Sequence, residues 1–131
     1  MKHFLELGGL GVREISIHEN DLLILAGPSM DLDGPVFIYR WKDALDVKGE
    51  SLTSRKDLSR VVAVPFAQGL KRPKGQETAE GKDTPEGHDH AEGLSVVTHS
   101  PLSVLVSYDS PHSSRFDGRS GVKADVFEVA L

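Results

Sequence analysis

The sequence predicts an all-β fold made of antiparallel meanders. Its apolar residues come in short runs that either alternate with polar residues or are rich in β-branched side chains, and the longest continuous runs are four to five residues. Both patterns are typical of strands. Gly, Pro, Asn and Asp, which favour turns, separate these runs. No heptad or extended 3.6-residue periodicity occurs, so no long helix is expected.

The first expected strands form a meander of three. In residues 11–18, Ile15 and Ile17 lie two positions apart and therefore face the same side of a sheet. After a polar turn, residues 22–26 are apolar on both faces, which is typical of a central strand buried on both sides. The β-branched and aromatic residues at 36–41 indicate a third strand.

The same order of features returns later in the chain, which divides it into two blade-like units, residues 4–42 and residues 58–131. In each unit a Gly-Leu start leads into an apolar run and then a Val-Phe pair. The matching segments are 9–13 and 93–97, 22–26 and 102–108, and 36–37 and 126–127. Another strand is expected at 61–66, at the start of the second unit.

Two polar stretches interrupt these strands. Residues 68–91 contain one large aliphatic residue, Leu70. They therefore bury too little apolar surface to offset the entropy of ordering, and a flexible polar linker is expected. Residues 42–60 are also polar and show no clear pattern beyond a short helical turn near residues 43–47.

Repeats of a small antiparallel sheet are typical of β-propellers, in which each blade packs against its neighbours. A blade takes about 40–45 residues and a closed ring needs at least about four blades. The 131 residues supply about two. We therefore expect one domain, residues 1–131, that is part of a larger or incomplete propeller. Missing N-terminal blades or a second copy of the chain would complete the ring. The alternative is a chance likeness between two meanders of one sandwich or barrel.

Several motifs follow one another in a distinctive order. They are Gly-Leu-Gly-Val-Arg-Glu-Ile at 9–15, Leu-Leu-Ile-Leu-Ala-Gly-Pro at 22–28, Val-Phe-Ile-Tyr-Arg-Trp at 36–41, Ala-Glu-Gly-Leu-Ser-Val at 91–96, Val-Ser-Tyr-Asp-Ser-Pro at 106–111, Arg115 and Ala-Asp-Val-Phe at 124–127. Together they resemble the C-terminal portion of the uncharacterised bacterial family domain of unknown function 3616. The resemblance covers nearly the whole chain apart from residues 68–90. It implies a β-propeller-type fold and no particular chemistry.

More distantly, the Glu-Gly-Leu pattern followed by an apolar strand is similar to phytase-like and esterase-like propellers. That resemblance implies acidic groups near a central channel that can hold Ca²⁺. Glu92 is the residue that carries over, whereas the first unit has Gly8 and Gly9 at the corresponding positions.

The composition limits the classes of function that are expected. The formal net charge is −5, with 15 basic and 20 acidic side chains, so binding to nucleic acid or to anionic lipid is not expected. The chain has no Cys and hence no thiolate nucleophile or metal ligand. No apolar stretch approaches the length of a signal-peptide core or of a membrane span. A soluble protein, cytoplasmic by default, is therefore expected, with no membrane insertion.

The densest set of metal-ligand residue types lies at the end of the polar linker within the second unit. His88 and His90 are spaced so that both would point the same way on a strand, and neutral imidazoles suit Zn²⁺. Glu92 and Asp109 begin and end neighbouring expected strands, where their carboxylates could hold Ca²⁺ or perform acid–base chemistry. The alternatives are a solvated loop at His88 and His90, a turn cap at Asp109, and pairing of Glu92 with Arg115 or a backbone N–H.

Two arginines are the other candidate binding residues. Arg13 follows the permissive Gly8-Gly9 pair, and its face depends on whether the strand bulges there. An anion is one candidate partner for Arg13, and a salt bridge is the simpler one. Arg115 lies in a polar loop near the end of the chain.

No motif for a nucleophile elbow or a phosphate-cradling loop is present. The leading hypothesis is a binding or scaffold module with no evident cofactor. A Ca²⁺-dependent hydrolase that uses Glu92 and Asp109, and a self-assembling domain whose open sheet edge pairs with a second copy, are the alternatives.

Overall fold

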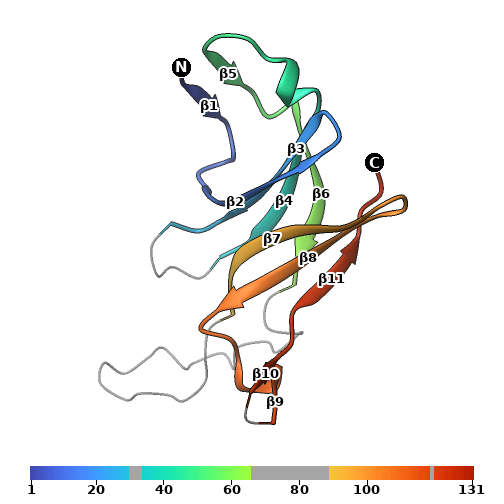
Figure 1. Ribbon diagram of the computed structural model, residues 1–131. Helices are drawn as coiled ribbons and strands as arrows, with labels where there is room; N and C mark the ends of the chain where they lie inside the picture. Colours follow the sequence, from blue (N-terminus) through green and yellow to red (C-terminus); the bar gives the residue numbers. More distant parts are fainter. Residues whose placement is uncertain (30–33, 66–88, 119) are drawn as a thin grey trace.

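A computed structural model of the chain describes residues 1–29, 34–65, 89–118 and 120–131. The described part is all-β and contains two larger antiparallel sheets, one of four strands and one of three, and two small two-stranded sheets (Figure 1). The all-β class with antiparallel meanders, expected from the sequence, is confirmed.

The four-stranded sheet has the order β2-β3-β4-β6. Its strands are β2 (Gly11–His18), β3 (Asp21–Gly27), β4 (Val36–Trp41) and β6 (Leu58–Val64). The first three lie where the sequence patterns place them. The sequence grouped residues 58–64 with the second unit, whereas β6 pairs with β4 and becomes the fourth strand of the first sheet.

The three-stranded sheet has the order β11-β8-β7. It consists of β7 (His90–His99), β8 (Leu102–Asp109) and β11 (Asp125–Glu128). β7 starts three residues before the expected strand at residue 93, because His90 and Ala91 also pair with β8. Most of the expected linker, residues 68–88, lies outside the described residues. Each sheet thus contains an antiparallel meander of three strands, and in the second sheet the small β9–β10 pair lies between β8 and β11 along the chain.

Short elements lie at the two ends of the molecule. At one end β1 (His3–Leu5) pairs in parallel with β5 (Ser51–Thr53), next to the 3-10 turn η1 (Ala44–Asp46). At the other end β9 (Phe116–Asp117) pairs with β10 (Gly121–Val122), next to the 3-10 turn η3 (Ser113–Arg115). β5, β9 and β10 were not expected from the sequence, because strands of two or three residues show no periodicity.

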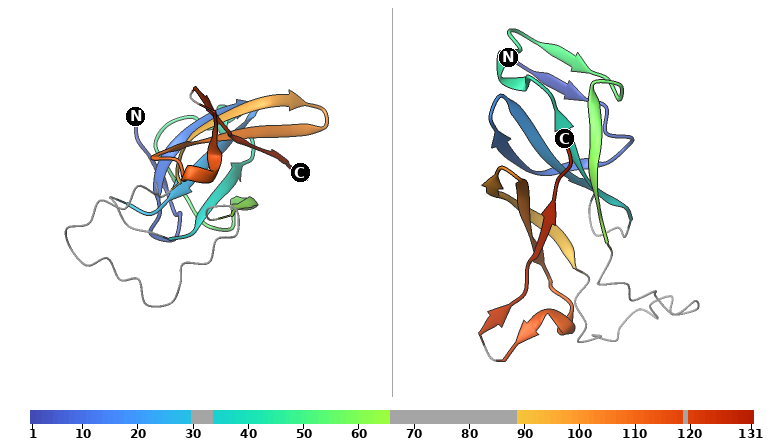
Figure 2. Two further views of the ribbon diagram at one scale, coloured as in Figure 1. Left: turned by 90° about the horizontal axis from the view of Figure 1, so that it is seen from below. Right: turned by 90° about the vertical axis from the view of Figure 1, so that its right-hand side faces the viewer.

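The two larger sheets lie against each other (Figure 2), and they share one apolar core. Alternate residues of β3, Leu23 and Leu25, face the second sheet and are fully buried. The intervening residues, Ile24 and Ala26, belong to a second core on the opposite face, under β1, η1 and the chain that joins β1 to β2. β3 is therefore buried on both faces, as its continuous apolar sequence predicted.

Two glycine positions allow close approaches of the chain. Gly8 and Gly9 both have positive φ, 68° and 87°, which lets the chain turn and place Leu7 against the second core. In β7, a Cβ added at Gly93 would collide with the Ser107 hydroxyl on β8. A larger residue at Gly93 would require this hydroxyl to rotate away.

Two packed antiparallel sheets are shared by propeller blades and by sandwiches. The propeller-like arrangement therefore stays a prediction. No helix among the described residues is long and apolar enough to cross a membrane.

Candidate functional site

Arg115, one of the predicted binding residues, lies in the interior at the β9–β10 end. Its side chain is fully buried. The guanidinium donates from Nε to Asp89 Oδ2 at 2.8 Å and from Nη2 to Asp125 Oδ2 at 2.9 Å, and it lies over the ring of Tyr108 at 3.7 Å from the centroid. Tyr108 also donates to Asp125, at 2.7 Å. Arg115 therefore holds together β8, β11 and the start of β7.

Asp89 is bound into this network by backbone groups as well. It has a φ of 50°, a region that Asp tolerates better than most residues. Its own N–H donates to the Ser110 carbonyl at 3.0 Å, and its Oδ1 accepts from the His112 N–H at 2.6 Å. One carboxylate thus fixes both the turn after β8 and the guanidinium of Arg115.

The electrostatics of this network favour its charged form. Burial by itself would raise the pKa of Asp125, but hydrogen bonds from Arg115 and Tyr108 outweigh burial and lower that pKa. Burial would lower the pKa of Arg115, and its two carboxylate partners raise it instead. For Tyr108, burial and the hydrogen bond to Asp125 both raise the pKa. The buried guanidinium is fully engaged and offers no exposed surface to a ligand.

Arg13 and Glu92 meet across the two sheets. Arg13 Nη1 lies 2.5 Å from Glu92 Oε1, and Arg13 also donates to the Pro28 carbonyl. Each of the two charged residues lies at a register shift of its strand, between Val12 and Glu14 in β2 and between Ala91 and Gly93 in β7. Bulges of this kind redirect a side chain, and here they turn both toward the neighbouring sheet. Glu92 pairs with Arg13 and not with Arg115.

The structure brings two of the other predicted metal ligands next to each other, but it does not complete a metal site among the described residues. His88 lies outside the described residues. His90 is half-buried and pairs in register with Asp109, which is exposed at the end of β8. Among the described residues, no three His, Asp or Glu side chains are grouped so that they could hold a metal ion.

A second cross-sheet contact was not anticipated from the sequence. His18 of β2 stacks on His99 of β7, with the ring centroids 5.2 Å apart, and their Nδ1 atoms are 3.0 Å apart. At that distance one ring must donate and the other accept. Together with the Arg13–Glu92 pair, this contact joins the polar ends of β2 and β7.

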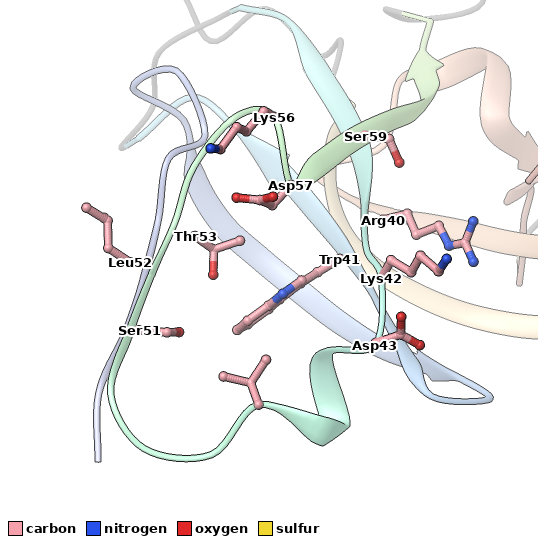
Figure 3. A pocket seen from close by; sticks show the side chains of 11 residues that line it. Arg40, Trp41, Lys42, Asp43, Ser51, Leu52, Thr53, Lys56, Asp57 and Ser59 are labelled. Carbon is pink, nitrogen blue, oxygen red and sulfur yellow. The ribbon is translucent and has the colours of Figure 1, made fainter.

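An open cavity of about 540 Å³ lies at the β1–β5 end of the first sheet, around Trp41 (Figure 3). It is lined by basic and acidic residues from the end of β4 and from the segment before β6, and by hydroxyl groups of β5 and β6. The lining residues used below are Trp41, Lys42, Asp43, Thr53, Lys56 and Asp57. In Figure 3 the indole projects between β5 on one side and Lys42 and Asp43 on the other.

Two residues on the floor of the cavity, Trp41 and Thr53, are almost fully buried, but each carries a hydrogen-bond donor that is not used within the described part. Trp41 is 7% exposed and Thr53 is 5% exposed. Neither the indole N–H nor the Thr53 hydroxyl has a hydrogen-bond partner among the described residues. No fully enclosed side-chain nitrogen or oxygen of the described part lacks a partner, so both atoms must reach the solvent of the cavity.

Reasoning from the sequence did not find this cavity. Its residues fall largely in the polar stretch 42–60, which shows no periodicity and was interpreted as a connection. One signal was available, because Trp41 is the only tryptophan of the chain and is followed at once by charged residues.

These features define the molecule as an all-β protein of packed antiparallel sheets, with a buried ion-pair network at one end and an open polar cavity at the other. The sequence matches the family model described as protein of unknown function (DUF3616) over residues 1–125. The chain therefore belongs to this family, as its motifs predicted. No curated protein and no solved structure matches it.

Proposed function

We propose that this domain is a binding module, in which the two sheets form a rigid scaffold and the Trp41 cavity receives a small polar molecule. The observation that carries the proposal is the open cavity itself, on whose floor the indole N–H of Trp41 and the hydroxyl of Thr53 face solvent without a hydrogen-bond partner among the described residues. Every fully enclosed side-chain nitrogen and oxygen of the described part has a partner. These two solvent-facing groups are therefore free to exchange water for a ligand.

The remaining charged groups support binding more than catalysis. A general acid or base must reach the substrate within hydrogen-bond distance. Asp89 and Arg115 are almost fully enclosed and bonded to each other, and Glu92 is engaged by Arg13. The cavity volume of about 540 Å³ lies within the range usual for small-molecule sites.

A thermal-shift screen of small polar metabolites tests this function. A ligand that binds only the folded protein raises the melting temperature by an amount that grows with the logarithm of the ratio of its concentration to its dissociation constant. We expect at least one compound to do so. We expect Ser51→Phe, at a cavity position whose side chain points toward the indole in Figure 3, to abolish the shift.

The matched control is Ser95→Phe, an exposed position of β7 outside the cavity. A shift of equal size in the Ser51→Phe variant would place the ligand elsewhere and would contradict the proposal. A panel in which no compound shifts the melting temperature would contradict it as well.

A further inference from the structure

Two arginine side chains reach the same backbone turn, in the chain that joins β1 to β2. The turn is formed by Gly8 and Gly9, which both have positive φ. A Cβ atom placed on Gly8 would lie 3.7 Å from Arg55 Nη2 and 3.9 Å from Arg60 Nη2. The ends of the two guanidinium groups therefore lie together beside Gly8, although one arginine precedes β6 and the other belongs to it.

Arg60 is held in this position by aromatic side chains of β4. Its Nε donates to the Tyr39 hydroxyl at 3.1 Å, and its Cζ lies 4.2 Å from the centre of the Phe37 ring. The Tyr39 hydroxyl donates in turn to the carbonyl of Leu7, the residue before the glycine turn, at 3.4 Å. These contacts leave both terminal nitrogens of Arg60 without a hydrogen-bond partner among the described residues.

Neither arginine has a counter-ion. Arg55 and Arg60 are exposed, and neither forms an ion pair within the part of the chain that the structure describes. Glu6 lies nearby, and its Oε2 accepts from the backbone N–H of Arg55 at 3.1 Å, but it does not pair with either guanidinium. The other described arginines are each paired with a carboxylate, namely Arg13, Arg40 and Arg115.

The turn itself adds two unused donors. The N–H groups of Gly8 and Gly9 form no hydrogen bond within the described residues, and both glycines are exposed. Apart from its neighbours in the chain, no described atom lies within 4 Å of the position that a Cβ would take at Gly9. Two cations and two backbone donors therefore lie side by side with open space next to them.

From these observations we infer that Arg55, Arg60 and the Gly8–Gly9 turn bind a phosphate group, either as inorganic phosphate or as a phosphate ester. Guanidinium groups pair with phosphate through two parallel hydrogen bonds, and exposed backbone N–H groups are a second common source of donors to such anions. A phosphate carries about two negative charges near neutral pH, which two arginines balance. None of these residues lines the Trp41 cavity, so the site is separate from the one proposed above.

Amide NMR gives a direct test, because the site contains two backbone N–H groups. Spectra of the full chain are recorded while inorganic phosphate, glycerol phosphate or acetate is added separately at constant ionic strength and pH. We expect the Gly8 and Gly9 signals to move saturably with one or both phosphates, and acetate to bind at least about tenfold more weakly. The tighter of the two phosphates distinguishes a free phosphate from an ester. Acetate binding as tight as phosphate, or no saturable movement, would overturn the inference.

Variants then locate the site. Arg55→Gln removes a guanidinium that forms no hydrogen bond or ion pair within the described part, so the fold should be kept and phosphate binding should weaken by about tenfold. Its matched control is Lys48→Gln, which removes the same charge from another exposed position. Arg60→Lys keeps the charge but loses the planar fork, and it should weaken binding as well. Equal affinities of the Arg55→Gln and Lys48→Gln variants would overturn the site.

The same variants separate this site from the Trp41 cavity. Phosphate bound at the glycine turn should raise the melting temperature of the Ser51→Phe variant as much as that of the wild type, and that of Arg55→Gln much less. The opposite result, a shift lost in Ser51→Phe and kept in Arg55→Gln, would assign phosphate to the cavity and overturn this inference.

Discussion

The two ends of this protein use charged side chains in opposite ways. At the β9–β10 end, Arg115 is fully buried, and Asp89 and Asp125 satisfy its guanidinium. At the β1–β5 end, Lys42 and Lys56 stay exposed around an open cavity, and the polar groups on its floor face solvent. The first arrangement stabilises the fold, whereas the second is the place where the proposed ligand would bind.

Under the proposed function, the most charged interior of this protein is not its binding site. Perturbed pKa values often cluster at active sites, but structural ion-pair networks perturb them as well. In the Arg115 network, burial and the partners inside the network together explain each pKa shift. The Trp41 cavity, by contrast, is lined by exposed charged residues and is open to solvent.

The largest expected effect is the loss of Arg115. The Arg115→Ala variant would leave Asp89 buried without its cation, and breaking a buried ion pair in this way costs about 3–5 kcal/mol. We expect urea denaturation to show a loss of that size. The exposed Lys42→Ala change should stay within about 0.5 kcal/mol of the wild type. A loss below about 1 kcal/mol for Arg115→Ala would show that the two ends contribute similarly.

Acid should affect both ends, and one substitution at each end separates their contributions. Burial alone would raise the pKa of Asp21, but the Asp43 N–H and Arg40 outweigh it, so this pKa is lowered, as is that of Asp125. A carboxyl with a lowered folded pKa stabilises the protein above its unfolded pKa, near 3.8, and this contribution is lost as the pH falls through the folded value.

We therefore expect the wild-type melting temperature to fall below about pH 4. Asp125→Asn and Asp21→Asn should each lower the stability at pH 7, by about 1 kcal/mol, and flatten the acid limb. Melting curves between about pH 2.5 and pH 7 measure both effects. An acid limb as steep in the Asp125→Asn variant as in the wild type would exclude that carboxylate as a source of the pH dependence.

The smallest expected effect belongs to the Arg13–Glu92 pair between the sheets. Glu92 is 38% exposed, and ion pairs in such positions contribute up to about 1 kcal/mol. A double-mutant cycle with Arg13→Ala and Glu92→Ala should give a coupling energy in this range. Arg13→Ala alone should cost more than Glu92→Ala, because Arg13 also donates to the Pro28 carbonyl. A coupling energy well above about 1 kcal/mol would make this contact comparable to the Arg115 network.

Much of the fold could be predicted from local patterns. β2, β3 and β4 lie where alternation, a continuous apolar run and β-branched residues indicated. Local patterns could not show which sheet residues 58–64 would join. Strand pairing depends on which sheet edge is free, and β6 pairs with β4 in the first sheet.

The candidate site was less predictable. Arg13, Glu92 and Arg115 were singled out as charged residues beside strands, but their partners are 79 residues away for Arg13 and 26 residues away for the Arg115–Asp89 bond. Sequence spacing carries no information about contacts of that range. The bulges that turn Arg13 and Glu92 toward each other also leave no reliable mark on the sequence.

The sequence by itself determined the all-β class, the central position of β3 and the family, because alternation, turn residues and motif order are local properties of the chain. Only the tertiary structure decided which charges are buried and which face a cavity. Burial depends on how the sheets pack, and Trp41, in a strand that the sequence did predict, becomes a cavity floor only because β1 and β5 pair beside it.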